Sequence, residues 1–285
     1  MFIFRLLGSI CAIALLYVLM VFIGLRFFLD ELVFVTSPDD LTNESFSFKV
    51  SEGKSEALVR VYQTKNAGHC VIFFLGRSGG IQRYEKEIFG YLLESGTNIY
   101  AISFPGYDGA AGRSTFSNVK ELGNSALVHI NKAGSCRLQE SVFLGRSLGG
   151  AIAVELAVKN PPAGILVDSV APSLAIAFRA KFKKSWFTTP AAYLPLEVFM
   201  AANPSFDQAI SKFSSRVVVL QGSHDLVASY EEIKGAIGTS QNVSVKEVKG
   251  ATHSNTHIVG RNLYLKELDS LFKRVQLQGP ELKTK

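Results

Sequence analysis

The chain has 285 residues, of which 47% are hydrophobic and 19% are charged. It is therefore long enough to bury the core of one large domain with an appended segment, and too apolar to be mainly disordered. The formal net charge is +6, but the basic residues form no run with interleaved aromatic side chains beyond a short cluster at 179–184, so nothing supports nucleic-acid binding. We interpret that cluster as a solvated loop, with contact to anionic lipid as the alternative.

The first segment of the chain is predicted to cross a membrane. Residues 6–25 read LLGSICAIALLYVLMVFIGL and carry no charged side chain. About 20 helical residues span about 30 Å, the thickness of the hydrocarbon core of a bilayer. A cleaved signal peptide has a shorter apolar run and a small-residue cleavage site, whereas Arg26-Phe27-Phe28-Leu29-Asp30 follows here. A buried core helix usually carries a polar stripe, and none is present. We therefore expect residues 1–30 to be an uncleaved single-pass anchor.

The charges that flank the anchor nearly balance, because Arg5 lies at one end and Arg26 at the other. A short N-terminal stub followed by a large domain favours the orientation in which that domain lies on the extracytoplasmic side of the membrane.

Beyond the anchor, residues 31–44 are predicted to be a connector, residues 45–275 a single domain and residues 276–285 a polar tail. The domain opens with two alternating segments, 45–50 and 57–62, which predict half-buried strands joined by a turn.

The rest of the domain alternates between strands and helices. The run CVIFFL at 70–75 is typical of a strand buried on both faces of a parallel sheet. Further strands are predicted at 98–104, 140–144, 164–167, 216–220 and 243–248, with helices at 83–95, 119–133, 148–159, 230–237 and 262–275. This alternation predicts an α/β fold with a mainly parallel, doubly wound sheet. Residues 173–207 are longer than an ordinary connection and predict a small cap, with a plain helical crossover as the alternative.

The three cysteines do not form a disulfide framework. Cys11 lies in the anchor, and Cys70 and Cys136 each stand just before a predicted strand. A bridge between the last two would require those strands to be neighbours. We expect two free, buried thiols instead.

A nucleophilic serine is predicted at Ser147, in the segment Gly145-Arg146-Ser147-Leu148-Gly149. Glycines two residues to either side let a strand turn sharply into a helix, and such a turn presents the hydroxyl at the end of the strand. The pattern alone is weak, but here an apolar strand precedes it and a small-residue helix follows. The alternative is a glycine-rich turn whose serine only caps the helix.

A serine hydroxyl also needs a base and a carboxylate that orients the base. His253 follows the last predicted strand and is the predicted base, with His257 as the alternative. Asp225 stands in a tight turn after the VVVL strand and is the predicted acid, with Asp168, at the end of an earlier strand, as the alternative. The preferred residues follow the order Ser, Asp, His.

Two backbone amides are needed to hold the oxyanion. We expect one from Leu148, directly after the serine. The second is expected from Arg77, in the glycine-rich loop 76–80 that follows the CVIFFL strand; a simple turn is the alternative for that loop.

Taken together, the motifs resemble those of the α/β-hydrolases, in particular the membrane-anchored, serine-aminopeptidase-like or dienelactone-hydrolase-like branch. They are LGRSGG at 75–80, FPGY at 104–107 with GRS at 112–114, GRSLGG at 145–150, QGSHD at 221–225 and GATH at 250–253. The resemblance covers residues 45–272 and implies the α/β-hydrolase fold. Two departures occur. Leu75 replaces the histidine that usually precedes the oxyanion-loop glycine, and residues 108–111 are an insertion.

The resulting hypothesis is a membrane-anchored serine hydrolase that cleaves an ester, thioester or amide through Ser147, His253 and Asp225, with an acyl-enzyme intermediate. The expected substrates are small-molecule, lipid or acylated compounds near the bilayer, and no metal or organic cofactor is implied. The alternatives are an acyltransferase with the same three residues and a non-catalytic binding module with a hydrolase fold.

Overall fold

The computed structural model describes residues 1–37, 39, 41, 46–65, 67–237 and 240–278. The predicted domain start at residue 45 and most of the predicted polar tail, residues 279–285, lie outside this part of the chain.

The centre of the molecule is an eight-stranded sheet with the strand order β1-β2-β4-β3-β5-β6-β7-β8. The strands are β1 (Ser47–Glu52), β2 (Ser55–Tyr62), β3 (His69–Phe74), β4 (Thr97–Ser103), β5 (Val142–Arg146), β6 (Gly164–Asp168), β7 (Arg216–Gly222) and β8 (Val243–Val248). The strand β2 runs antiparallel to both of its neighbours, β1 and β4. The strands from β4 to β8 are parallel. The predicted mainly parallel sheet is confirmed.

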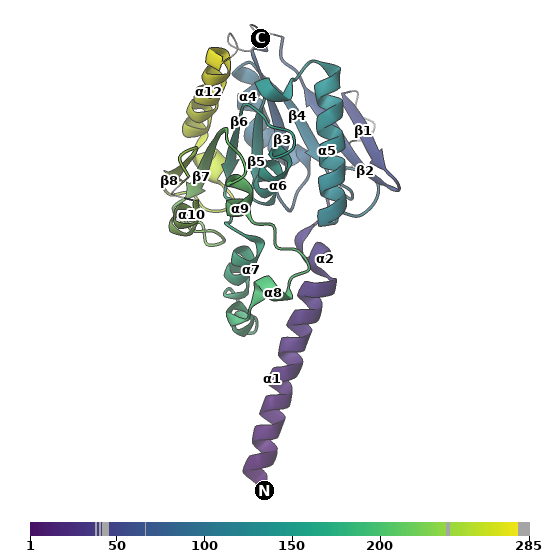
Figure 1. Ribbon diagram of the computed structural model, residues 1–285, viewed down its shortest axis with the longest axis vertical. Coiled ribbons are helices and arrows are strands. Elements are labelled where there is room, and N and C mark those ends of the chain that lie inside the picture. The colour runs from purple at the N-terminus through teal and green to yellow at the C-terminus, as the bar shows by residue number, and fades with distance from the viewer. Residues whose placement is uncertain (38, 40, 42–45, 66, 238–239, 279–285) are drawn as a thin grey trace.

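Helices cover both faces of the sheet (Figure 1), because successive side chains of a strand point to opposite faces. Ile72 and Phe74 of β3 belong to one hydrophobic cluster, whereas Val71 and Phe73 belong to the other. The first face is covered by α5 (Phe116–Ala133), α6 (Leu148–Ala157) and α10 (Tyr230–Ile237). The second face is covered by α3 (Ile81–Tyr84), η1 (Glu85–Phe89), α4 (Gly90–Glu94) and α12 (Arg261–Gln278).

The helix α5 illustrates why the chain folds locally as predicted. Thr115 caps its start, since the side chains and backbone amides of Thr115 and Asn118 form a reciprocal capping box. Gly134 ends the helix in the left-handed region, with a φ of 75°. The buried side chains recur at helical spacing and form one stripe toward the sheet: Val119, Leu122, Ala126, Leu127 and Ile130.

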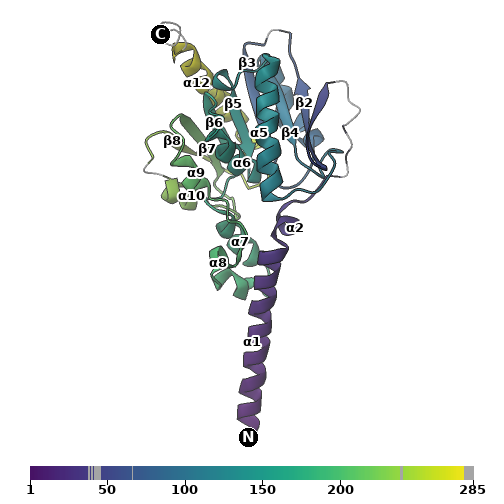
Figure 2. The same cartoon turned by 45° about the vertical axis from the view of Figure 1, so that its right-hand side comes forward.

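The N-terminal helix α1 (Phe2–Phe27) projects from the domain, and its N-terminal part extends beyond the cap (Figures 1 and 2). It is long and apolar enough to cross a membrane, and its most apolar stretch is not buried. Its last turn and the short helix α2 (Leu29–Val33) behave differently. Leu25, Leu29, Val33 and Phe34 are all buried in the cluster that also contains α5 and α6. The end of α1 is therefore continuous with the domain core.

Polar contacts also fix α2 to the domain. The Asp30 carboxylate accepts a hydrogen bond from the backbone N–H of Phe116 at 3.1 Å. Phe116 is the first residue of α5, so this N–H has no partner within the helix. Glu31 forms an ion pair with Arg113 at 2.6 Å. The packing of this stretch on the domain is not predicted by the sequence pattern, which is that of an apolar helix followed by a connector.

The predicted cap at 173–207 consists of short helices between β6 and β7: α7 (Leu174–Phe182), η3 (Thr189–Tyr193), α8 (Leu196–Phe199) and α9 (Phe206–Ile210). Both views place α7 and α8 beside the domain end of α1 (Figures 1 and 2). The backbone N–H of Ala201 donates to the carbonyl oxygen of Leu25 at 3.1 Å, so the cap contacts α1 directly.

The expectation of free thiols at Cys70 and Cys136 is wrong, because the two residues form a disulfide with a Cα–Cα distance of 5.8 Å. The reason is topological. The strands β3 and β5 are direct parallel neighbours, with Val71 opposite Val142, so the residues that precede them meet at one edge of the sheet. Cys11, in α1, is a free cysteine.

Candidate active site

Ser147 stands at the turn between β5 and α6, with a φ of 51° and a ψ of −118°. A serine in the left-handed region is strained, and the surrounding glycines show how tightly the turn is held. A Cβ atom on Gly149 would lie 2.2 Å from the carbonyl oxygens of Phe74 and Leu75, and one on Gly145 would lie 2.6 Å from the carbonyl oxygen of Gly149. The predicted sharp turn therefore requires glycine at both flanking positions.

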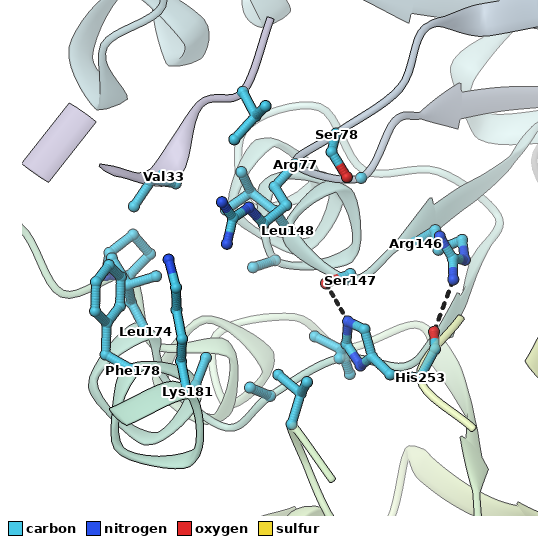
Figure 3. A pocket seen from close by; sticks show the side chains of 18 of the residues that line it. Val33, Arg77, Ser78, Arg146, Ser147, Leu148, Leu174, Phe178, Lys181 and His253 are labelled. Atoms are coloured by element: carbon cyan, nitrogen blue, oxygen red, sulfur yellow. Dashed lines mark hydrogen bonds between the residues drawn. The ribbon is translucent and has the colours of Figure 1, made fainter. Parts of the chain in front are cut away.

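The structure brings Ser147, His253 and Asp225 together in one chain of hydrogen bonds. The Ser147 hydroxyl lies 3.1 Å from Nε2 of His253, as the dashed line in Figure 3 marks. Nδ1 of His253 lies 2.9 Å from Oδ2 of Asp225. Both distances are within hydrogen-bonding reach, so Nε2 can accept the serine proton while Nδ1–H donates to the carboxylate.

The Asp225 carboxylate is buried and is oriented by its own donors. Oδ1 accepts from the backbone N–H groups of Val227, at 2.8 Å, and Ala228, at 3.0 Å. Oδ2 accepts from the Gln221 side-chain amide at 2.9 Å. These hydrogen bonds fix the orientation of the Asp225 carboxylate toward His253.

The side chains of the two alternative residues, His257 and Asp168, make no hydrogen bond to the Ser147 hydroxyl and lie in a buried cluster around Arg146. Nε of Arg146 donates to Nδ1 of His257 at 3.1 Å and lies 3.5 Å from Oδ1 of Asp168. Nε2 of His257 lies 2.8 Å from Glu87, and the Tyr264 hydroxyl donates to Asp168 at 3.0 Å. Because arginine can only donate, Nδ1 of His257 is an acceptor and its proton is on Nε2.

Burial sets the protonation of this cluster. It lowers the pKa of His257, against the opposing charge of Asp168, in accord with a neutral ring. It also raises the pKa of the Asp168 carboxyl, against the charge of Arg146. Nη2 of Arg146 donates to the backbone carbonyl of His253 at 2.7 Å, so the cluster holds the loop that carries the predicted base. Sequence reasoning missed this role of Arg146, although its place inside the elbow motif was a signal.

The predicted oxyanion donors flank the serine. Leu148 is the first residue of α6, so its N–H has no partner within the helix and lies at the positive end of the helix dipole. The loop of Arg77 is held from two sides. Its carbonyl oxygen accepts from the Tyr107 hydroxyl at 2.7 Å and from the Val35 backbone N–H at 3.1 Å. Val35 follows α2, so the segment after α2 holds this loop in place.

The two departures from the family pattern also have structural counterparts. The Leu75 side chain is buried and cannot form a hydrogen bond. Instead, the backbone N–H of Gly76, which follows Leu75, donates to the Tyr84 hydroxyl at 3.1 Å. Asp108, in the insertion, is buried and accepts from the Ile81 N–H at 3.0 Å, at the start of α3. Burial raises the pKa of the Asp108 carboxyl. Other residues thus support the loop that the usual histidine would shape.

A cavity of about 520 Å³ opens beside the serine and the histidine. Figure 3 shows Ser147 and His253 at one end and the cap residues Leu174, Phe178 and Lys181 at the other. Apolar side chains from α2 and the segment after it, from α6 and from the chain after β6 line much of it: Val33, Val35, Leu148, Val170, Leu174 and Phe178. Within the described ranges, no group of three or more His, Cys, Asp or Glu residues is placed to hold a metal ion.

Comparison with known proteins agrees with this architecture. The model of the alpha/beta hydrolase family matches residues 82–256, more than half of the chain. Alpha/beta hydrolase domain-containing protein 17B of Homo sapiens is 24% identical over 77% of this chain and 72% of its own length. Alpha/beta hydrolase domain-containing protein WAV2 of Arabidopsis thaliana is 23% identical over 70% of this chain and 68% of its own length.

Solved structures share the fold. The Pyrococcus furiosus esterase Pf2001 superposes with a TM-score of 0.66 at 16% identity, covering 85% of this chain and 98% of that one. An esterase from Exiguobacterium antarcticum superposes with a TM-score of 0.56 at 14% identity, covering 77% and 96%. By its family match and its architecture, the chain belongs to the alpha/beta hydrolase family.

Proposed function

We propose that the protein is a membrane-anchored serine hydrolase with Ser147 as nucleophile, His253 as base and Asp225 as the residue that orients the base. The observation that carries the proposal is the unbroken hydrogen-bond chain between these three side chains at the mouth of an apolar cavity. Two solved relatives in fold are named esterases, which favours an ester, with a thioester or amide as variants of the same chemistry.

The reaction proceeds in two steps. His253 Nε2 takes the hydroxyl proton of Ser147 as Oγ bonds to the carbonyl carbon, and the resulting oxyanion accepts hydrogen bonds from the Leu148 and Arg77 amides. The tetrahedral intermediate collapses, and the leaving group departs with the proton from His253. Water, deprotonated by the same ring, then attacks the acyl-enzyme and releases the acid and Ser147.

Anchoring by α1 is supported by its length and composition, and by the burial of Leu25 and Leu29 in the domain core. Removal of a signal peptide up to or beyond these residues would strip core side chains, so the segment fits an uncleaved anchor. The disulfide between Cys70 and Cys136 supports the extracytoplasmic side, because disulfides persist in oxidising compartments.

The proposal is tested with the full chain in detergent and a fluorophosphonate probe, which reacts with activated serines. We expect labelling of the wild type, loss of labelling in Ser147→Ala, and wild-type labelling in Ser211→Ala, which changes an exposed serine on the cap side. Hydrolysis of p-nitrophenyl esters of increasing chain length then measures the acyl preference. Labelling that persists in Ser147→Ala would overturn the assignment, and turnover only with an added alcohol would indicate acyl transfer.

A further inference from the structure

The charged side chains that line the cavity beside Ser147 are basic. Arg77 enters it from the oxyanion loop, and Lys181 and Lys184 enter it from the cap. Among the described residues that line the cavity, none is acidic. Figure 3 shows the Arg77 and Lys181 side chains pointing toward one another from opposite walls, with Ser147 to one side.

Other cations near the site have carboxylate partners, and these do not. Arg146 faces Asp168, and Arg83 forms an ion pair with Glu87. No ion pair involves Arg77 or Lys181 in the part of the chain that the structure describes. The ammonium group of Lys181 lies 5.6 Å from the centre of the Phe178 ring, and burial together with the Arg77 charge lowers the pKa of Lys181.

Arg77 is half-buried and Lys181 is exposed, but both line the same cavity. Two like charges that converge on one cavity repel one another until an anion lies between them. Their guanidinium and ammonium donors suit the oxygens of a carboxylate or a phosphate. We propose that the substrate is an acyl compound with an anionic group, a carboxylate or phosphate, which Arg77 and Lys181 bind while the apolar wall takes the hydrocarbon part. This inference rests on the proposed hydrolase function and names its substrate class.

The test is competition with fluorophosphonate labelling by octanol, octanoate and octyl phosphate, which share a chain length and differ in the head. We expect the two anions to protect Ser147 at concentrations about tenfold or more below that of octanol, the effect of one charge-assisted hydrogen bond. A stronger effect of octyl phosphate than of octanoate assigns phosphate, and the reverse assigns carboxylate.

Variants of the cap lysines provide the controls. Lys181→Met is expected to lose most of the preference for anions, and Lys181→Arg to retain it. Lys183→Met removes a neighbouring exposed lysine that does not line the cavity, and should compete as the wild type does.

The kcat/KM for hydrolysis of octanoyl glycerol phosphate should exceed that for octanoyl glycerol, if the substrate shows the same preference as the competitors. Equal protection by all three compounds, or a preference that survives in Lys181→Met, would overturn the anionic subsite. Absence of labelling in the wild type would instead overturn the proposed hydrolase function.

A second, independent observation concerns the outer surface of the cap. Four large apolar side chains there are strongly exposed and form what we call the cap tip: Trp186 at 87%, Phe187 at 54%, Tyr193 at 79% and Val198 at 74%. Lys183 and Lys184, also exposed, precede them in the chain. Exposed aromatic side chains beside lysines are typical of surfaces at the membrane–water interface.

The cap tip lies alongside the anchor. The Tyr17 hydroxyl donates to the carbonyl oxygen of Phe187 at 3.0 Å, and the two rings meet edge to face at 6.0 Å. Phe22 and Phe199 form a similar pair at 5.4 Å. The cap therefore contacts α1 from Leu25 back to Tyr17.

The length of α1 gives the depth at which these contacts lie relative to the membrane. Its 26 residues span about 39 Å, about 9 Å more than the hydrocarbon core of a bilayer. Tyr17 lies ten residues before Phe27, or about 15 Å along the axis. Even if the whole excess emerges on the domain side, Tyr17 is about 6 Å inside the hydrocarbon. We infer that the cap tip is inserted into the leaflet on the domain side, with the lysines at the level of the headgroups.

Trp186 makes this inference testable, since it is the only tryptophan in the chain. In liposomes of phosphatidylcholine with brominated acyl chains, the fluorescence of the full chain should be strongly quenched relative to liposomes with unbrominated lipid. The matched control moves the tryptophan in Trp186→Phe/Phe46→Trp, because Phe46 is 66% exposed and lies beside Val61, near the sheet edge opposite the site. Quenching equal to that of the control variant would overturn insertion of the cap tip.

Discussion

The burial of α2 leads to a prediction about what the anchor does for the domain. Leu29 is 3% exposed and belongs to the core cluster, whereas Leu32, in the same short helix, is 39% exposed. Leu29→Ala should therefore leave a cavity, and Leu32→Ala should not. Because alanine is the better helix former, helix propensity cannot explain a loss of stability in either variant.

The magnitude follows from the depth of burial. Truncation of a buried leucine costs about 2–5 kcal/mol of unfolding free energy, and an exposed substitution stays within about 0.5 kcal/mol. At about 2–4 °C per kcal/mol for a domain of this size, Leu29→Ala should lower Tm by roughly 4–20 °C. Near-UV circular dichroism of the full chain in one detergent, with the wild type and Leu32→Ala measured in parallel, records the transition.

An equal Tm for the two variants would refute the reasoning. The segment after α1 would then be a flexible tether, and the argument that the anchor is an uncleaved part of the folded domain would lose its main support.

Three further changes probe the site and its surroundings. Gly149→Ala should abolish probe labelling, because its Cβ would lie 2.2 Å from two carbonyl oxygens, whereas Gly235→Ala, with open space around the new Cβ, should label as the wild type does. Arg146→Met should cost about 3–5 kcal/mol of unfolding free energy, because the buried Asp168 carboxylate loses its arginine partner. Urea unfolding measures this loss, and an unchanged midpoint would contradict the buried cluster. Cys136→Ser should lower the free energy of unfolding by about 2–5 kcal/mol under oxidising conditions, because the disulfide is lost. Reduction of the wild type should lower it by the same amount. A larger loss in the variant than in the reduced wild type would assign the thiol another role.

Much of the fold and of the candidate site is predictable from local sequence patterns. The strands follow from runs and alternations of apolar residues, and the glycines around Ser147 mark the turn because no other residue fits there. The order of Ser147, Asp225 and His253 along a strand–helix alternation predicts that they meet, because parallel strands end at one edge of the sheet. The structure brings these three side chains into hydrogen-bonding contact and leaves His257 and Asp168 in the cluster around Arg146.

Properties that depend on distant segments were decided only by the tertiary structure. Cys70 and Cys136 pair because β3 and β5 are neighbours, and that adjacency is not a property of either segment alone. The end of the apolar anchor looks in sequence like any lipid-facing helix, yet Leu25 is buried in the core. Arg77 and Lys181 converge on one cavity although 104 positions separate them in the chain. Local patterns set which element each residue joins and which face it occupies, whereas the meeting of two such faces is a product of packing.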